Sequence, residues 1–169
     1  MKTLYLMRHA HSDRAQPGVR DIDRPLSRRG RKDCWLMGRY LQGSQNLPEL
    51  ILFSSALRVR ETLNGITEFT GEGVEAKQIE KLYSGGLEDY FETLRSLPLS
   101  AEHVMIIGHN PILEDLAAKL RSDPFGKSFR EFSPAAVGCF GLPAKSWQEL
   151  TWGSGDFKWL MTPGLLESP

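Results

Sequence analysis

Short apolar runs alternate with longer amphipathic segments along this chain. The runs at residues 4–7, 50–53 and 104–107 are apolar throughout, which is typical of strands that are buried on both faces of a sheet. Each run is followed by a segment with apolar residues three and four positions apart, the spacing that places them on one face of a helix. The alternation predicts an α/β fold, a three-layer α/β/α sandwich around a mainly parallel central sheet.

Residues that begin or end helices lie where this pattern requires them. Ser27 is placed to cap the first helix, while Gly71 and Pro98 follow the last apolar positions of the second and third helices. Asn110 and Pro111 come directly after the run at 104–107. We expect Asn110 to be the N-cap of the next helix and Pro111 to be its first residue.

The C-terminal part of the chain has a different pattern. Residues 137–142, 148–152 and 157–161 are short extended stretches separated by Gly, Pro and Ser, which predicts short strands and an antiparallel edge strand. A weaker strand is expected within residues 74–82. The length of 169 residues is within the usual size of one domain, so we expect residues 1–169 to form a single domain.

Composition and charge restrict the partners of the chain. Its 21 Lys and Arg balance 21 Asp and Glu, so it lacks the overall basic field that draws proteins to nucleic acid or to anionic membranes. The first apolar run is too short for a signal peptide or a membrane span. Cys34 and Cys139 form neither a CxxC pair nor a disulfide framework. We therefore expect a cytoplasmic protein that binds neither nucleic acid nor membranes.

Polar side chains follow three of the predicted strands at the points where the strands end. Arg8 and His9 come after the first run, residues 54–58 after the second, and His109 after the third. Because the carboxyl ends of parallel strands meet at one edge of a sheet, and ligands of open α/β sheets bind beyond that edge, these residues are expected to converge.

These residues also carry a family resemblance. The segment Arg8-His9-Ala10 resembles the Arg-His-Gly signature of the histidine phosphatase, or phosphoglycerate mutase-like, superfamily. The rest of that family's pattern follows in order, at residues 23–27 with Gly30, then at 54–62 and at 108–111. The small size, the segment Asp23-Arg24-Pro25-Leu26 and the last segment, Gly-His-Asn-Pro, are most similar to the SixA-like branch of phosphohistidine phosphatases.

The resemblance implies a role for four residues. His9 is the implied nucleophile, which attacks a phosphoryl group and carries it as a phosphohistidine intermediate. Arg8 and Arg58 are the implied phosphate ligands, since the forked guanidinium donors of arginine match phosphate oxygens. His109 is the implied second histidine, which contacts the transferring oxygens. The implied reaction needs no metal and no cofactor, because these cationic and imidazole groups stabilise the charge of the transferring phosphoryl group.

The proton donor of related enzymes has no clear counterpart here. Relatives that act on phosphate esters place a glutamate after the third strand, whereas Ser84 lies at about that position. Glu80, Glu88 and Asp13 are nearby alternatives. A phosphohistidine leaves as an imidazole and needs less protonation than an alkoxide, which favours a protein phosphohistidine phosphatase. A small-molecule phosphate-ester phosphatase is the alternative, and the loop from His11 to Arg24 is expected to influence the choice.

Two other classes of function compete with this hypothesis. His9 and His11 resemble an HxH metal pair and would suit a metal-dependent hydrolase. Against it, Arg8 would oppose a cation, no further cluster of ligands follows, and the chain is shorter than the roughly 250 residues of a β/α barrel. The missing glutamate instead motivates a non-catalytic phosphate-binding module. A mutase is disfavoured because so short a chain has few residues for a closing lid.

Overall fold

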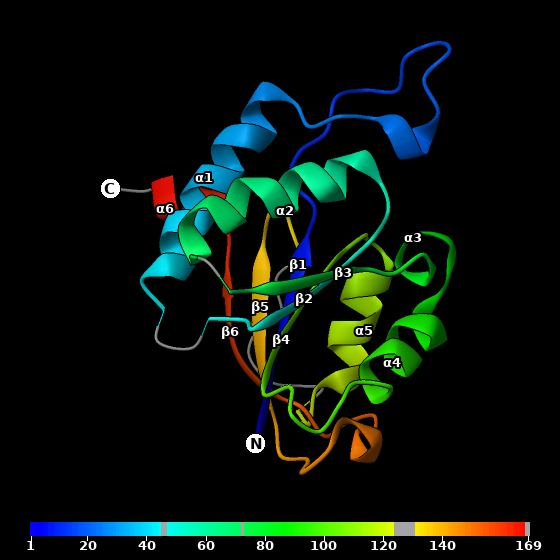
Figure 1. The fold of residues 1–169 in the computed structure, drawn as a ribbon, viewed down its shortest axis with the longest axis vertical. Coiled ribbons are helices and arrows are strands. Elements are labelled where there is room, and N and C mark those ends of the chain that lie inside the picture. Colours follow the sequence, from blue (N-terminus) through cyan, green and yellow to red (C-terminus); the bar gives the residue numbers. More distant parts are fainter. Residues whose placement is uncertain (45–46, 72, 124–130, 168–169) are drawn as a thin grey trace.

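In the computed structural model, which describes residues 1–44, 47–71, 73–123 and 131–167, six strands form one sheet (Figure 1). Their order across the sheet is β3-β2-β4-β1-β5-β6. The strands are β1 (Lys2–Arg8), β2 (Leu50–Phe53), β3 (Glu75–Gln78), β4 (His103–Gly108), β5 (Val137–Leu142) and β6 (Asp156–Met161).

The pairing of the strands confirms the predicted mainly parallel sheet. β1 pairs in parallel with β4, β4 with β2, and β2 with β3. β5 runs antiparallel to β1, and the edge strand β6 pairs antiparallel with β5. The predicted antiparallel edge strand is therefore present as β6, and β5 lies between it and β1.

Helices cover both faces of the sheet and complete the predicted three layers. Figure 1 shows α1, α2 and α6 on one face, with α3, α4 and α5 on the other. Two short 3-10 helices, η1 and η2, lie outside these layers. The helices are α1 (Arg28–Gln42), α2 (Leu57–Thr70), α3 (Lys81–Ser84), α4 (Leu87–Arg95), α5 (Ile112–Leu120), α6 (Pro163–Glu167), η1 (Asp21–Asp23) and η2 (Trp147–Glu149). Within the described residues no helix is long and apolar enough to cross a membrane.

The two helical layers account for the uniformly apolar strands. In β1, Leu4 and Leu6 pack with α4 and α5, whereas Tyr5 and Met7 pack with α1 and α2. All four side chains are buried, because successive residues of a strand point to opposite faces and both faces are covered. Polar side chains are thereby confined to the two ends of the strand, Lys2 and Thr3 at its start and Arg8 at its C-terminal end.

The expected start of α5 was wrong by one residue. The helix begins at Ile112, and Pro111 occupies the N-cap position in place of Asn110. Asn110 does not cap the helix: its Oδ1 accepts no hydrogen bond from the described residues, while its Nδ2 donates to Glu114 Oε1 at 2.8 Å and to the carbonyl of Phe132 at 3.2 Å. The Asn110 side chain therefore ties the helix to a distant segment of the chain.

Two of the predicted strands differ in the structure. The strand expected at residues 148–152 was wrong, since this region begins with η2 and Trp147 is fully buried with Nε1 donating to the carbonyl of Ala101 at 2.8 Å. Trp147 and Leu150 are part of the hydrophobic core that also contains the buried residues of α4 and α5. The strand expected within residues 74–82 is limited to β3, and the turn of helix α3 follows it.

Candidate active site

The ends of β1, β2 and β4 bring together the four residues that the sequence singled out. The backbone N–H of His9 donates to the carbonyl of Gly108 at 3.1 Å, and the imidazole rings of His9 and His109 have centroids 5.3 Å apart. Arg58, in the first turn of α2, reaches both rings, with Nε 3.4 Å from His9 Nε2 and Nη2 3.5 Å from His109 Nδ1. Arg8 is the neighbour of His9 at the end of β1. The charge of Arg8 also acts on both imidazoles, so the four side chains form one electrostatic cluster.

His9 is oriented and kept neutral by its surroundings. Its Nδ1 lies 2.8 Å from the carbonyl of Ala10, and because a carbonyl can only accept, Nδ1 carries the proton. Its Nε2 then presents a lone pair, to which Arg58 Nε donates. The pKa of His9 is lowered to about 3, first by burial and then by the charges of His109, Arg58 and Arg8, which outweigh the opposing bond to Ala10. A neutral, oriented imidazole can act as a nucleophile through Nε2.

His109 is held by a buried serine. Its Nε2 lies 2.7 Å from the hydroxyl of Ser54, which is fully buried where β2 ends. The backbone N–H of His109 donates to the Tyr90 hydroxyl at 3.4 Å. Burial, followed by the charge of Arg58, lowers the pKa of His109 to about 4. Both histidines of the cluster are thus neutral near pH 7.

Arg8 uses only some of its guanidinium donors in hydrogen bonds within the described residues. Its Nη1 donates to the carbonyl of Phe132 at 2.9 Å, and its backbone N–H donates to the carbonyl of Ala136 at 3.1 Å. Its Nε is buried, with no hydrogen-bond partner among the residues that the structure describes. Burial lowers the pKa of Arg8, which the negative charge of Glu114 opposes. A guanidinium in this state is suited to bind an anion.

Asp21 is a member of the cluster that the sequence reasoning missed. The guanidinium of Arg58 donates through Nη1 to the backbone carbonyl of Asp21 at 2.8 Å and through Nη2 to its carboxylate at 3.1 Å. The Tyr83 hydroxyl also donates to this carboxylate, at 3.0 Å, and Arg24 does so at 3.0 Å. Partial burial acts to raise the pKa of Asp21, but these bonds outweigh it and lower the pKa to about 2. In this structure a carboxylate holds the donors of Arg58.

The proton donors proposed from the sequence lie outside the cluster. Ser84 is exposed, and its hydroxyl donates to the carbonyl of Glu80 at 3.2 Å. The carboxylate of Glu80 accepts from Ser55 at 2.9 Å, while Asp13 and Glu88 are exposed. Among the described residues, no hydrogen bond joins these four candidates to the two histidines or two arginines.

The sequence placed Asp21 in a polar loop, but nothing near it in the sequence indicated that it would reach Arg58.

His11 belongs to a different network from His9. Its Nδ1 lies 2.7 Å from the hydroxyl of Ser27, the residue that caps α1 by accepting from the backbone of Gly30 at 3.1 Å. A Cβ on Gly30 would lie 2.1 Å from the carbonyl of His11, so only glycine permits this approach. Within the described parts of the chain, no group of three or more His, Cys, Asp or Glu is arranged to hold a metal ion. The second histidine of the HxH pair, His11, therefore connects its loop to the start of α1.

Thr62 joins the nucleophile loop to α2. Its hydroxyl accepts from the backbone N–H of Ala10 at 3.0 Å and donates to the carbonyl of Arg58 at 2.7 Å. Thr62 is fully buried. This single side chain therefore fixes the segment beside His9 relative to the helix turn that carries Arg58. The sequence included Thr62 within a motif but indicated no contact for it.

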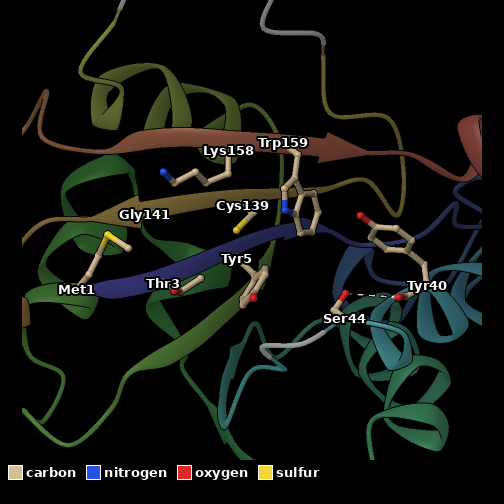
Figure 2. Close-up of a pocket in the computed structure, with 9 residues that line it drawn as sticks. All are labelled: Met1, Thr3, Tyr5, Tyr40, Ser44, Cys139, Gly141, Lys158 and Trp159. Carbon is tan, nitrogen blue, oxygen red and sulfur yellow. Dashed lines mark hydrogen bonds between the residues drawn. The ribbon is translucent and has the colours of Figure 1, made fainter.

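A separate hollow lies away from the cluster, over β1, β5 and β6 (Figure 2). Tyr5, Tyr40 and Trp159 gather there, with ring centroids 6.1 Å apart for Tyr5 and Trp159 and 5.6 Å apart for Tyr40 and Trp159. Cys139 also lines the hollow, but burial raises the pKa of its thiol to about 11, so it stays protonated near pH 7. None of the four predicted site residues lines this hollow, and its aromatic side chains pack against one another.

Comparison with known proteins agrees with this geometry. A model of the histidine phosphatase superfamily (branch 1) matches residues 4–90. The chain belongs to this superfamily. An uncharacterised chloroplastic protein of Arabidopsis thaliana is 31% identical over 167 residues, which cover 94% of this chain and 74% of the relative. The phosphohistidine phosphatase SixA of Escherichia coli is 26% identical over 164 residues, covering 95% and 93%.

Two solved structures extend the similarity to the branch. The protein assigned as phosphohistidine phosphatase SixA in Nakamurella multipartitia has a TM-score of 0.83 at 26% identity, covering 96% of each chain. The protein histidine phosphatase SixA in complex with tungstate has a TM-score of 0.81 at 26% identity, covering 98% of this chain and 99% of its own. The predicted resemblance to the SixA-like branch of the histidine phosphatases is confirmed.

The lowered pKa values of the two histidines predict a loss of stability in acid. In the unfolded chain both titrate near the ordinary value of 6.5, whereas in this histidine phosphatase His9 titrates at about 3 and His109 at about 4. Between about pH 6.5 and about pH 4 the unfolded chain binds more protons, so the free energy of unfolding should fall as pH falls, by up to about 1.4 kcal/mol per pH unit for each histidine. Urea unfolding at about pH 7 and about pH 5 measures this.

The matched variants are His9→Asn, which should reduce the pH dependence, and His103→Gln, which should preserve it. His103 lies at the opposite end of β4 from His109. An equal pH dependence in the wild type and in His9→Asn would contradict the pKa assigned to His9.

The contact of Asp21 with Arg58 predicts competition with anions. Asp21→Asn should tighten the binding of inorganic phosphate by about twofold to fivefold, the scale of one partly exposed ion pair, because Arg58 loses a competing negative charge. Titration calorimetry with phosphate measures the change. Asp23→Asn is the control, since Asp23 pairs with Arg20 in the same 3-10 helix. Unchanged or weaker phosphate binding in Asp21→Asn would be incompatible with competition.

Proposed function

We propose that the protein is a phosphatase that transfers a phosphoryl group to Nε2 of His9 and releases it to water, with a protein phosphohistidine as its substrate. The observation that carries the proposal is the neutral His9, whose Nδ1–H is bonded to the carbonyl of Ala10 and whose Nε2 faces Arg58. A family whose relatives include SixA supports the same chemistry.

In the first step, the lone pair of His9 Nε2 attacks phosphorus. The new P–N bond forms as the bond from phosphorus to the substrate ring breaks; with a proton on the other nitrogen of that ring, the electron pair stays on the departing nitrogen and a neutral imidazole leaves. The ring of His9 becomes cationic in this step, and the bond from Nδ1–H to the carbonyl of Ala10 strengthens as charge develops. In the second step, water attacks the phosphohistidine, phosphate leaves, and the electron pair returns to Nε2.

Arg8, Arg58 and His109 surround the position where the phosphoryl oxygens would lie. The guanidinium groups supply fixed positive charge, which matters more in a buried site than in water. Ser54 holds the ring of His109 toward the cluster. Tungstate is a tetrahedral oxyanion like phosphate, and its presence in a SixA structure similar to this chain supports an oxyanion site of this kind.

The state of Asp21 favours phosphohistidine over a phosphate ester. An alkoxide leaving group needs a proton, yet the carboxylate that contacts Arg58 has its pKa lowered to about 2 by the bonds it accepts, and so holds no proton near pH 7. A departing imidazole needs little protonation. We also propose that the reaction proceeds without a metal and in the cytoplasm, the compartment that suits the buried free thiols of Cys34 and Cys139.

A substrate panel tests the proposal. The protein should release phosphate from a phosphohistidine-containing protein at a kcat/KM at least about tenfold above that for aryl and sugar phosphates, and a chelator should not change the rate. Equal or faster turnover of esters would favour the small-molecule phosphatase. Phosphate binding with no turnover of any substrate would favour a non-catalytic phosphate-binding module. Loss of activity on addition of a chelator would favour a metal-dependent hydrolase.

His9→Ala is the matched variant for the panel. It should abolish turnover, and brief exposure of the wild type to substrate should label intact protein at His9 under conditions that avoid acid. His103→Gln should keep both activity and label. Full activity in His9→Ala would refute the intermediate.

The arginine in α2 should be needed for turnover. Arg58→Ala is expected to reduce kcat by at least about a hundredfold, the loss seen when one transition-state donor is removed. Arg60→Ala is the matched control, because Arg60 is exposed two positions further along the same helix. Steady-state kinetics on the preferred substrate measures both variants. A wild-type rate in Arg58→Ala would show that another arginine binds the phosphoryl group.

A further inference from the structure

We infer that Glu114 is a positioning residue for Arg8: through the backbone of Phe132, its carboxylate holds the Arg8 guanidinium in the orientation that binds phosphate. The inference rests on the proposed function, in which Arg8 is a phosphate ligand. Glu114 lies in the first turn of α5, in a part of the sequence to which no motif drew attention.

One carboxylate oxygen of Glu114 organises the segment opposite Arg8. Oε1 accepts from the backbone N–H of Phe132 at 2.9 Å and from Asn110 Nδ2 at 2.8 Å. The carbonyl of Phe132 accepts in turn from Arg8 Nη1 at 2.9 Å and from Asn110 Nδ2 at 3.2 Å. Glu114 thus binds the N–H of the same residue whose carbonyl binds Arg8, and Asn110 joins both acceptors.

The segment from Phe132 to Ala136 is fixed at its other end by the backbone of the nucleophile strand. The N–H of Ala135 donates to the carbonyl of His9 at 3.1 Å, and Arg8 N–H donates to the carbonyl of Ala136 at 3.1 Å. The Phe132 ring is fully buried and packs on Gly138, where a Cβ would approach it to 2.8 Å. Glu114 therefore acts on a segment that is already registered against Arg8 and His9, and it determines where the Phe132 carbonyl points.

Glu114 places a negative charge near a residue that is proposed to bind phosphate, and packing alone would not require a charge there. Its negative charge lies close enough to act on Arg8, and both side chains line the same hollow beside the cluster. An anion near a phosphate ligand weakens phosphate binding by electrostatics alone. If the charge of Glu114 dominated, its removal would tighten phosphate binding. If positioning dominates, removal of the acceptor weakens binding, so the two effects have opposite signs.

The experiment is a double-mutant cycle read out by the affinity for inorganic phosphate. Glu114→Ala should weaken phosphate binding roughly tenfold, the scale of losing charge-assisted hydrogen bonds, whereas Glu114→Gln, which keeps the acceptor oxygen, should remain within about threefold of the wild type. In an Arg8→Ala background, Glu114→Ala should change the affinity by less than about twofold, because no guanidinium remains to be positioned. Asp115→Asn is the control, since Asp115 is exposed in the same helical turn.

A second variant keeps the test valid if Glu114→Ala does not fold. Glu114→Met retains the volume of the side chain and removes both acceptor oxygens, so it should also lose roughly tenfold in affinity while Glu114→Gln does not. Thermal unfolding of each variant, measured without phosphate, separates this loss from a loss of folded protein.

The outcomes separate the inference from the proposed function. Unchanged or tighter phosphate binding in both Glu114→Ala and Glu114→Met would overturn the inference, as would an equal loss in the wild-type and Arg8→Ala backgrounds, which would mark a general structural effect. If Arg8→Ala alone binds phosphate as tightly as the wild type, Arg8 is not a phosphate ligand, and the proposed site fails together with the inference.

Discussion

The guanidinium of Arg58 is the group on which the arrangement of the site depends. It donates to His9, approaches His109 and is held by both the backbone and the carboxylate of Asp21. A charged group this deeply buried is stable only when its donors are satisfied, and here three segments of the chain satisfy them. The same positive charge helps to keep the two imidazoles neutral. One buried arginine thus couples the assembly of the site to its chemistry.

The sequence predicted those features of the fold that depend on local pattern. Apolar runs identified the central strands, because a strand covered on both faces has no polar positions, and Ser27 identified the start of α1 because a capping hydroxyl acts within one helical turn. Trp147 shows the limit of such reasoning: aromatic and apolar residues near it resembled a strand, while their burial comes from packing against a distant loop. Asn110 was misread for the same reason, since its partners include Phe132.

The site divides along the same line. Arg8, His9, Arg58 and His109 were proposed because each follows a predictable element, and parallel strands bring their ends together in the structure. Asp21 and Glu114 were not found, because their importance lies in contacts with residues more than thirty positions away or through the backbone of another segment. Carboxylates on loops and exposed helix turns are common, and composition cannot distinguish those that reach into a site. For the same reason, spacing alone did not indicate which partners Ser84 and Glu80 have in the structure.

Asp21 and Glu114 are each associated with one arginine, but they act on it in different ways. One occupies the donors of its arginine, and the other fixes the orientation of its arginine while leaving a donor available. Asp21 binds Arg58 directly and so occupies donors that a phosphate would use, whereas Glu114 acts on Arg8 through Phe132 and leaves Nε of that guanidinium without a partner among the described residues. A buried donor without a partner costs about 1–3 kcal/mol, and an anion that bonds to it removes that cost. In the proposed mechanism Arg58 therefore exchanges the Asp21 carboxylate for phosphate, whereas Arg8 keeps a buried donor available at the expense of stability. The proposed site therefore predicts that the two arginines contribute differently to phosphate binding, although the sequence presents them as equivalent.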